Sequence, residues 1–214
     1  MLKLDDPPVL SRREARRRDR RDAIMAVAQR SFLENGYAAT TMSSIAATLG
    51  GSKGTLWSYF PSKEALFAAV LEQATKAYRD NLAHLLEPGG ELASTLRTFT
   101  RALLQRVLRP DSLALYRLVV AEAARSPEMG AIFCELGPRY TRGLLGQFLQ
   151  GAMKAGQLRE ADPDIAARTL VILAMSGCYQ KVMLGQIDTA TQEQIEADVV
   201  FAVDFFLRGY APDR

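Results

Sequence analysis

The residues around position 55 have side chains and a spacing suited to contacting DNA. Leu56 and Phe60 lie four residues apart, so in a helix they share one face and anchor it to a core. The positions left on the opposite face are Lys53, Gly54, Trp57 and Ser58. An ammonium group and the free N–H groups of a first helical turn bind phosphate, and a glycine lets the backbone approach the duplex closely. The sequence therefore predicts a DNA-contacting helix over residues 53–60, and the alternative is an ordinary helical hairpin with Trp57 in its core.

Two further short helices are expected to hold that helix in place. Residues 22–35 have an apolar stripe that ends at Asn35-Gly36, a helix stop signal. Residues 42–49 follow the N-cap candidates Thr40-Thr41 and end at Gly50-Gly51, where glycine can adopt the positive φ of a tight turn. Two helices joined by such a turn form a helix-turn-helix, whose second helix lies in the major groove.

A run of basic residues precedes the first of these helices. Residues 12–21 contain seven arginines, and Pro7-Pro8 stand before them. We expect residues 1–20 to be a disordered basic arm that reaches phosphates or a narrow minor groove through Arg17, Arg18 and Arg20. The alternative is a solvated tail with no contact to DNA.

Composition limits the other classes of function. Residues 1–63 hold 11 Lys and Arg against 6 Asp and Glu, so the positive charge is concentrated at the front of the chain. Cys134, Cys178 and His84 are isolated from one another, so we expect no metal site, no catalytic pair, no cofactor and no enzyme activity. Neither a signal peptide nor a membrane span is recognisable, which predicts a cytoplasmic protein.

The N-terminal segments resemble the tetracycline-repressor (TetR) family of bacterial transcriptional regulators. The resemblance rests on Gly36-Tyr37, Thr40-Thr41, Ile45-Ala46 and the run from Ser52 to Leu66, although Gly51, Trp57 and Ser58 differ from the usual family residues. It implies an all-α homodimer with a three-helix DNA-binding domain at residues 21–66 and a ligand-binding and dimerisation domain at 67–214. The family's DNA contacts fall on Met42, Ser52, Lys53, Gly54, Thr55, Trp57, Ser58, Tyr59 and Lys63.

Helical periodicity continues to the end of the chain. We expect helices at 63–86, 92–108, 112–125 and 127–155, the last interrupted at Gly137-Pro138, followed by helices at 165–184 and 195–207. The last two are apolar on more than one face, and such helices must be covered on both sides. We expect the second cover to be the same helices of another subunit, through Val171, Met175, Val199, Val203 and Phe206. The alternative is a fully internal helix pair in a monomer.

Residues 113–185 also resemble the AefR-like C-terminal group of the same family, which implies a hydrophobic or amphipathic effector. Large adaptable side chains with few ionisable groups predict a mostly apolar pocket. Its expected lining is Phe99, Leu103, Tyr116, Val120, Phe133, Phe148, Met175, Ser176 and Tyr179.

Three classes of function remain at this stage. The first is a repressor that a small molecule releases from a palindromic operator. The second is a ligand-independent DNA-organising or activating protein of the same fold. The third is an all-helical enzyme or lipid carrier, which would leave the basic helix-turn-helix unexplained.

Overall fold

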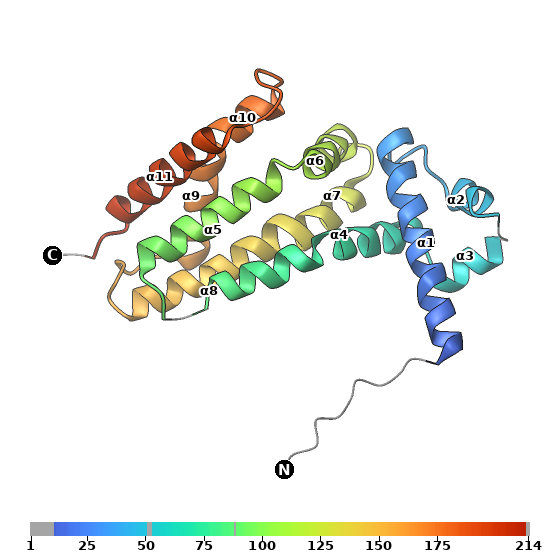
Figure 1. The fold of residues 1–214 in the computed structure, drawn as a ribbon, viewed down its shortest axis with the longest axis horizontal. Coiled ribbons are helices and arrows are strands. Elements are labelled where there is room, and N and C mark those ends of the chain that lie inside the picture. The colour runs from blue at the N-terminus through green and yellow to red at the C-terminus, as the bar shows by residue number, and fades with distance from the viewer. Residues whose placement is uncertain (1–10, 51–52, 88, 213–214) are drawn as a thin grey trace, which may run out of the picture. The chain divides into compact units, whose positions relative to one another are not determined.

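The chain is built from helices, as the sequence predicts. The computed structural model describes residues 11–50, 53–87 and 89–212, and within them it contains helices and turns but no strand (Figure 1). The helices are α1 (Arg12–Asn35), α2 (Met42–Thr48), α3 (Lys53–Tyr59), α4 (Lys63–Leu85), α5 (Leu92–Val107), α6 (Pro110–Glu122), α7 (Pro127–Cys134), α8 (Tyr140–Lys154), α9 (Pro163–Met175), α10 (Cys178–Met183) and α11 (Gln192–Gly209). A π-helical turn, η1 (Glu135–Arg139), joins α7 to α8 at the predicted Gly137-Pro138 interruption.

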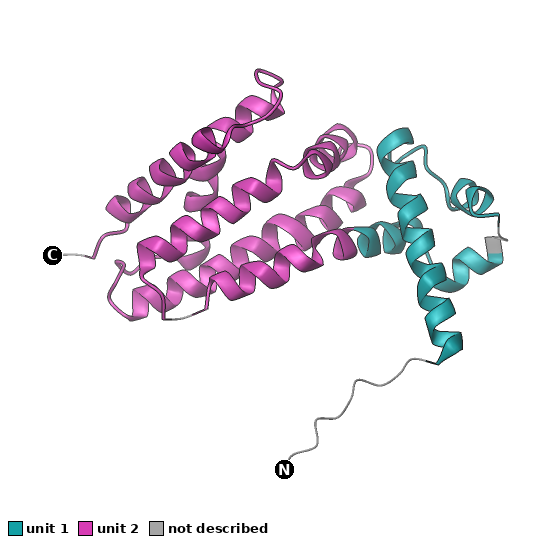
Figure 2. Ribbon diagram, viewed as in Figure 1, with its two compact units in different colours: residues 1–70 teal, residues 71–214 magenta. Residues whose placement is uncertain are grey.

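The chain divides into two compact units (Figure 2). Unit 1 comprises residues 1–70 and unit 2 residues 71–214. Helix α4 supplies residues to both, because its first eight residues belong to unit 1 and the remainder to unit 2.

Helix α1 is longer than the sequence predicted. The hydroxyl of Ser11 accepts a hydrogen bond from the backbone N–H of Glu14 (3.2 Å), and the Glu14 carboxylate accepts one from the N–H of Ser11 (2.8 Å). This reciprocal capping box starts the helix at Arg12. The prediction of a disordered arm over residues 1–20 is therefore wrong for residues 12–20, while residues 1–10 lie outside the described part of the chain. The arginines of this segment therefore lie on a helix.

Three aromatic rings pack together in the core of unit 1. The ring centroids of Phe32 and Tyr37 are 5.4 Å apart, and Phe67 lies 5.4 Å from Phe32 and 5.1 Å from Tyr37. These rings come from the end of α1, the following turn and α4, so they fix the corner at which the chain turns towards α2. The buried Thr40 hydroxyl donates a 2.7 Å hydrogen bond to the carbonyl of Gly36 and closes that turn.

Unit 2 is a helical bundle. Helix α9 packs against α8 and α11, and α11 also packs along α5, as Figure 1 shows for α5 and α11. Its main core contains side chains from most of these helices, among them Leu96, Phe99, Leu145, Leu170 and Phe206. Two ion pairs tie α5 to α11: Arg97 to Asp204 at 2.8 Å and Arg101 to Glu196 at 2.5 Å.

The predicted helix over residues 165–184 is broken into α9 and α10. The carboxylate of Asp198, on α11, accepts a 2.6 Å hydrogen bond from the N–H of Cys178 and so caps α10. A Cβ atom at Gly177 would overlap this carboxylate, which is why the break falls at a glycine. The capping group is twenty residues away in sequence, and local sequence reasoning could not find it.

Candidate DNA-binding surface and effector cavity

Helices α2 and α3 form a helix-turn-helix. The Thr41 hydroxyl accepts a 3.0 Å hydrogen bond from the N–H of Ser44 and starts α2. The turn after α2 contains Gly50 with φ of +64°, a left-handed conformation that favours glycine. Gly51 and Ser52, which we expected in the turn and at the N-cap of α3, lie outside the described residues.

Helix α3 has one buried and one exposed face, as predicted. Leu56 and Phe60 are buried in the core of unit 1, whereas Trp57 is 47% exposed. Gly54, Thr55 and Ser58 are also exposed, and Tyr59 is half-buried. The side chain of Lys53 lies outside the described part of the structure. The outward orientation of Trp57 is confirmed, and the alternative of a core tryptophan is wrong.

Met42 was expected on the DNA-contacting surface, but its side chain is only 7% exposed. Met42 is the first residue of α2, and its long apolar side chain packs inward from there. This prediction is therefore corrected: Met42 stabilises unit 1. Lys63 is half-buried, and its Nζ lies 4.2 Å from the centroid of the Tyr37 ring.

Three arginines of α1 lie beside α3. Arg13, Arg16 and Arg17 line an open hollow together with Ser58 and Tyr59. The guanidinium carbon of Arg17 is 6.0 Å from the centroid of the Tyr59 ring. The sequence analysis named Arg17 but not Arg13 or Arg16, because it treated the segment as a disordered arm with no defined face. With the segment helical, the three- and four-residue spacing places all three on one face.

The other predicted arginines have different surroundings. Arg20 donates to the carbonyl of Leu49 at 3.5 Å, at the end of α2. Arg18 is exposed.

Unit 2 contains a cavity of about 350 Å³. Five of the residues predicted to bind a ligand line it: Leu103, Tyr116, Phe133, Met175 and Tyr179. Tyr116 is at the centre of an aromatic cluster, with its ring centroid 6.0 Å from that of Phe133 and 6.3 Å from that of Tyr179. Burial raises the pKa of Tyr179, with a further contribution from Tyr116, so its phenol stays neutral at physiological pH.

Four predicted ligand residues are not among those that line this cavity. Phe99 is buried in the main core and Phe148 packs against that core. Val120 is 62% exposed, and the exposed Ser176 donates its hydroxyl to the carbonyl of Leu173. Helical periodicity gave the apolar positions of each helix but not which of them line a space.

A group of polar residues in the cavity wall was missed. Tyr78 on α4, Arg106 on α5, Ser112 on α6 and Thr141 on α8 all line the cavity. Burial raises the pKa of Tyr78, although the neighbouring Thr141 and the charge of Arg106 work in the opposite direction. The residues come from four helices and have no common spacing, so no sequence signal could have grouped them.

Comparison with known proteins agrees with both halves of this description. A family model described as bacterial regulatory proteins of the tetR family matches residues 24–70, and one described as the C-terminal domain of AefR-like transcriptional repressors matches residues 94–212. The chain belongs to the TetR family of transcriptional regulators. The resemblance seen in the sequence is thereby confirmed.

Solved and curated regulators are similar over most of the chain. The flavonoid-responsive regulator FrrA is 34% identical, with a TM-score of 0.78 over 92% of this chain and 99% of its own. A TetR-family regulator from Mesorhizobium loti is 25% identical, with a TM-score of 0.77 over 92% of this chain and 98% of its own. The HTH-type transcriptional regulator YhgD of Bacillus subtilis is 24% identical over 72% of this chain and 80% of its own.

The apolar outer face of this TetR-family chain differs from the one predicted. Val199, Val203 and Phe206 are buried in the core of their own subunit, so they are unavailable to a partner. Val171 and Met175 are half-buried and line the cavity. The large exposed apolar residues of α9 and α11 are Ile165, Ile172, Val200, Phe201 and Phe205. The exposed apolar residues of α11 therefore lie on a different side of the helix from the predicted Val199, Val203 and Phe206. Within the described residues, no helix has the length and apolar character needed to cross a membrane.

Proposed function

We propose that this TetR-family regulator is a repressor that binds a palindromic operator as a homodimer and is released by a small aromatic effector. The main support is the cavity of about 350 Å³ in unit 2, a size at the lower end of the roughly 300–1,000 Å³ of small-molecule sites. A ligand-independent DNA-organising protein would have no need of an aromatic-lined cavity. The name of FrrA, a flavonoid-responsive regulator, supports an aromatic effector here.

The DNA contacts are assigned to the exposed face of α3 and the arginine face of α1. We assign base contacts to Trp57 and Ser58, and phosphate contacts to Thr55, Tyr59 and Lys63 together with Arg13, Arg16 and Arg17. We also place Arg18 and Arg20 near the backbone. A two-fold dimer presents two such surfaces, and a palindromic operator matches that symmetry.

Helix α4 offers a route between effector and DNA. Thr75 and Tyr78 of α4 line the cavity, and Leu66 and Phe67 of the same helix are buried in the core of unit 1. An effector that favours one position of α4 over another changes the spacing of the recognition helices. By linkage, DNA then weakens effector binding by the same factor by which the effector weakens DNA binding. The corresponding coupling free energy is typically about 1–3 kcal/mol.

The test begins by sequencing the DNA that the protein retains from random fragments at moderate salt. Fluorescence anisotropy on the recovered operator, with and without the flavonoid naringenin, then measures release. We expect naringenin to lower operator affinity, and Phe133→Ala, which removes cavity wall, to weaken that response while DNA binding without ligand persists. Val120→Ala is the matched control, because Val120 is exposed and does not line the cavity. Retained DNA without a palindrome, or Phe133→Ala behaving as Val120→Ala, would refute the proposal.

A further inference from the structure

The charges in the wall of the cavity all have one sign. Arg106, Arg142 and Arg168 line it, and no Asp or Glu is among its described lining residues. The rest of the wall consists of apolar and aromatic side chains with a few hydroxyl groups. A cationic ligand would meet no counter-charge here, and burying an unpaired charge is unfavourable.

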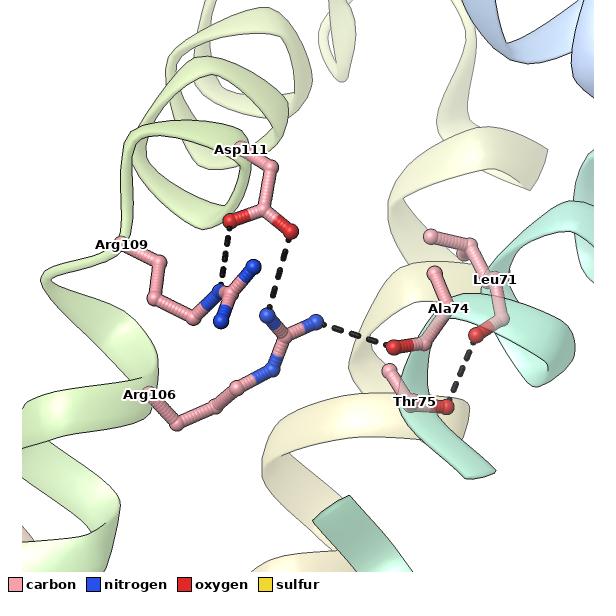
Figure 3. A network of polar contacts seen from close by, with 6 residues as sticks. All are labelled: Leu71, Ala74, Thr75, Arg106, Arg109 and Asp111. Atoms are coloured by element: carbon pink, nitrogen blue, oxygen red, sulfur yellow. Dashed lines mark hydrogen bonds and ion pairs between the residues drawn. The ribbon is translucent and has the colours of Figure 1, made fainter. Parts of the chain in front are cut away.

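Arg106 belongs to a cluster that keeps a net positive charge (Figure 3). Its guanidinium pairs with Asp111 at 3.2 Å, Arg109 pairs with the other oxygen of the same carboxylate at 3.0 Å, and Arg106 also donates to the carbonyl of Ala74 at 3.1 Å. Burial opposes ionisation of Asp111, but the hydrogen bonds from Arg109 and Arg106 outweigh it and hold its pKa below the usual value. Two guanidinium groups thus share one carboxylate.

Arg142 and Arg168 make no ion pair with any residue that the structure describes. The Nε of Arg142 donates to the carbonyl of Pro138 at 3.3 Å, which leaves its charge uncompensated. Arg168, on α9, is exposed and also lines the cavity. Both can therefore accept an anionic partner without giving up an existing one.

Hydroxyl groups in the same wall can add neutral hydrogen bonds. The Oγ of Ser112 is buried and has no hydrogen-bond partner among the described residues. A buried hydroxyl without a partner is destabilising, and a ligand oxygen that reaches it removes that penalty. Tyr78 and Thr141 line the same cavity, and because burial keeps Tyr78 protonated, its phenol can donate.

We propose that the effector is an aromatic acid, whose ring packs against Tyr116, Phe133 and Tyr179 and whose anionic oxygen is bound by the cavity guanidinium groups. Guanidinium–carboxylate hydrogen bonds are charge-assisted and stronger than neutral ones. The cavity thus selects anionic over cationic aromatic molecules of equal size. This inference rests on the proposed effector role of the cavity.

Three compounds with one ring system and different charge test the charge preference: 2-naphthoic acid, its methyl ester and 2-naphthylmethylamine. Titration calorimetry on the full-length protein without DNA measures each affinity. We expect the acid to bind at least about tenfold more tightly than the ester, a difference of roughly 1.4 kcal/mol, and the amine to be weakest. Equal affinity for acid and amine, or no binding of the acid in the millimolar range, overturns the proposal.

The arginines are tested with the double variant Arg142→Gln/Arg168→Gln. Arg106 is left intact, because its bonds to Asp111 and Ala74 also hold the fold. We expect the variant to bind the acid about tenfold more weakly and the ester unchanged. The control is Arg125→Gln/Arg139→Gln, which removes the same charge from exposed residues that do not line the cavity. Equal loss in both variants overturns the arginine assignment.

A separate anisotropy measurement distinguishes this inference from the proposed function. If the acid binds with the expected charge preference but leaves the operator complex intact, the effector role fails and the ligand class stands. If naringenin releases the operator but the acid has no preference over the amine, the ligand class fails and the effector role stands.

Discussion

Phe201 and Phe205 pack against each other on the outer face of α11, with ring centroids 6.0 Å apart and 51% and 59% of each residue exposed. Val200 on the same helix and Ile172 on α9 are exposed as well. Exposing several large apolar side chains together to water is unfavourable, and such exposed apolar patches mark interaction sites. A second copy of these helices would cover them.

The first prediction concerns this face. Phe201→Asp/Phe205→Asp should convert dimers to monomers, because it introduces charge where apolar side chains would meet, and should leave the helical content unchanged. Sedimentation velocity gives the oligomeric state and circular dichroism the helical content. Val203→Asp is the contrast: Val203 is 0% exposed in its own subunit, so the buried charge should unfold the protein. A double variant that stays dimeric would place the subunit interface elsewhere.

Trp57 provides the second prediction. Trp57→Ala should abolish detectable operator binding and leave the melting temperature nearly unchanged, because this side chain is half-exposed and faces away from the core. The adjacent Leu56→Ala should instead lower the free energy of unfolding by about 2–5 kcal/mol, the usual range for a buried leucine. Thermal denaturation and anisotropy on the same samples separate the two effects. Full operator affinity in Trp57→Ala would remove this residue from the interface.

The third prediction concerns the arginine face of α1. Replacing Arg13, Arg16 and Arg17 with Gln should weaken binding to operator and random DNA alike, because phosphate contacts contain no base information. The slope of log affinity against log salt is negative, and each lost phosphate contact reduces its magnitude by about 0.9. We therefore expect the magnitude to decrease by roughly 2–3. The helix should persist, since its capping residues Ser11 and Glu14 are unchanged. An unaltered salt slope would mean that these arginines do not reach DNA.

Lys63 is expected to stabilise unit 1 whether or not it also reaches DNA. Its Nζ donates a 3.0 Å hydrogen bond to the carbonyl of Tyr37 and lies over the Tyr37 ring. Lys63→Met keeps the apolar stem and removes the charge, so it should lower the free energy of unfolding by about 1–2 kcal/mol. Urea denaturation measures this loss, and Lys76→Met, at an exposed residue that pairs with Asp80, is the control. Equal stability of both variants would contradict the role given to the Tyr37 contact.

The two cysteines should differ in reactivity. Burial raises the pKa of the Cys178 thiol to about 12, with a further contribution from Asp198, so at pH 8 it is almost entirely protonated. The thiolate is the reactive form, and Cys134 is exposed. A chromogenic disulfide reagent should therefore label one thiol per chain at pH 8 in the folded protein, and the second after denaturation. Cys134→Ser should abolish the first reaction, and labelling of folded Cys134→Ser at the wild-type rate would contradict this assignment.

The start and stop of most helices could be predicted from the sequence because the groups that fix them are close together in the chain. Thr41 caps α2 through Ser44, and Asp162 caps α9 through the N–H groups of residues 164 and 165. Pro110 could have been used in the same way: as the first residue of α6 it moves the start of that helix two residues ahead of the predicted position. The helix-turn-helix and the exposure of Trp57 follow from local signals of this kind.

The cavity, the outer face and the break before α10 depended on tertiary structure. An apolar pattern on two faces of α11 does not say which face the subunit buries; packing against α5 and α9 places Val203 inside and Phe205 outside. Asp198 caps α10 from another helix, and the polar residues of the cavity wall come together from α4, α5, α6 and α8. Helix caps and apolar periodicity involve residues three or four positions apart, so both can be recognised in the sequence. Contacts between distant segments form only when the helices pack, and in this protein that packing decides which side chains an effector or a second subunit can reach.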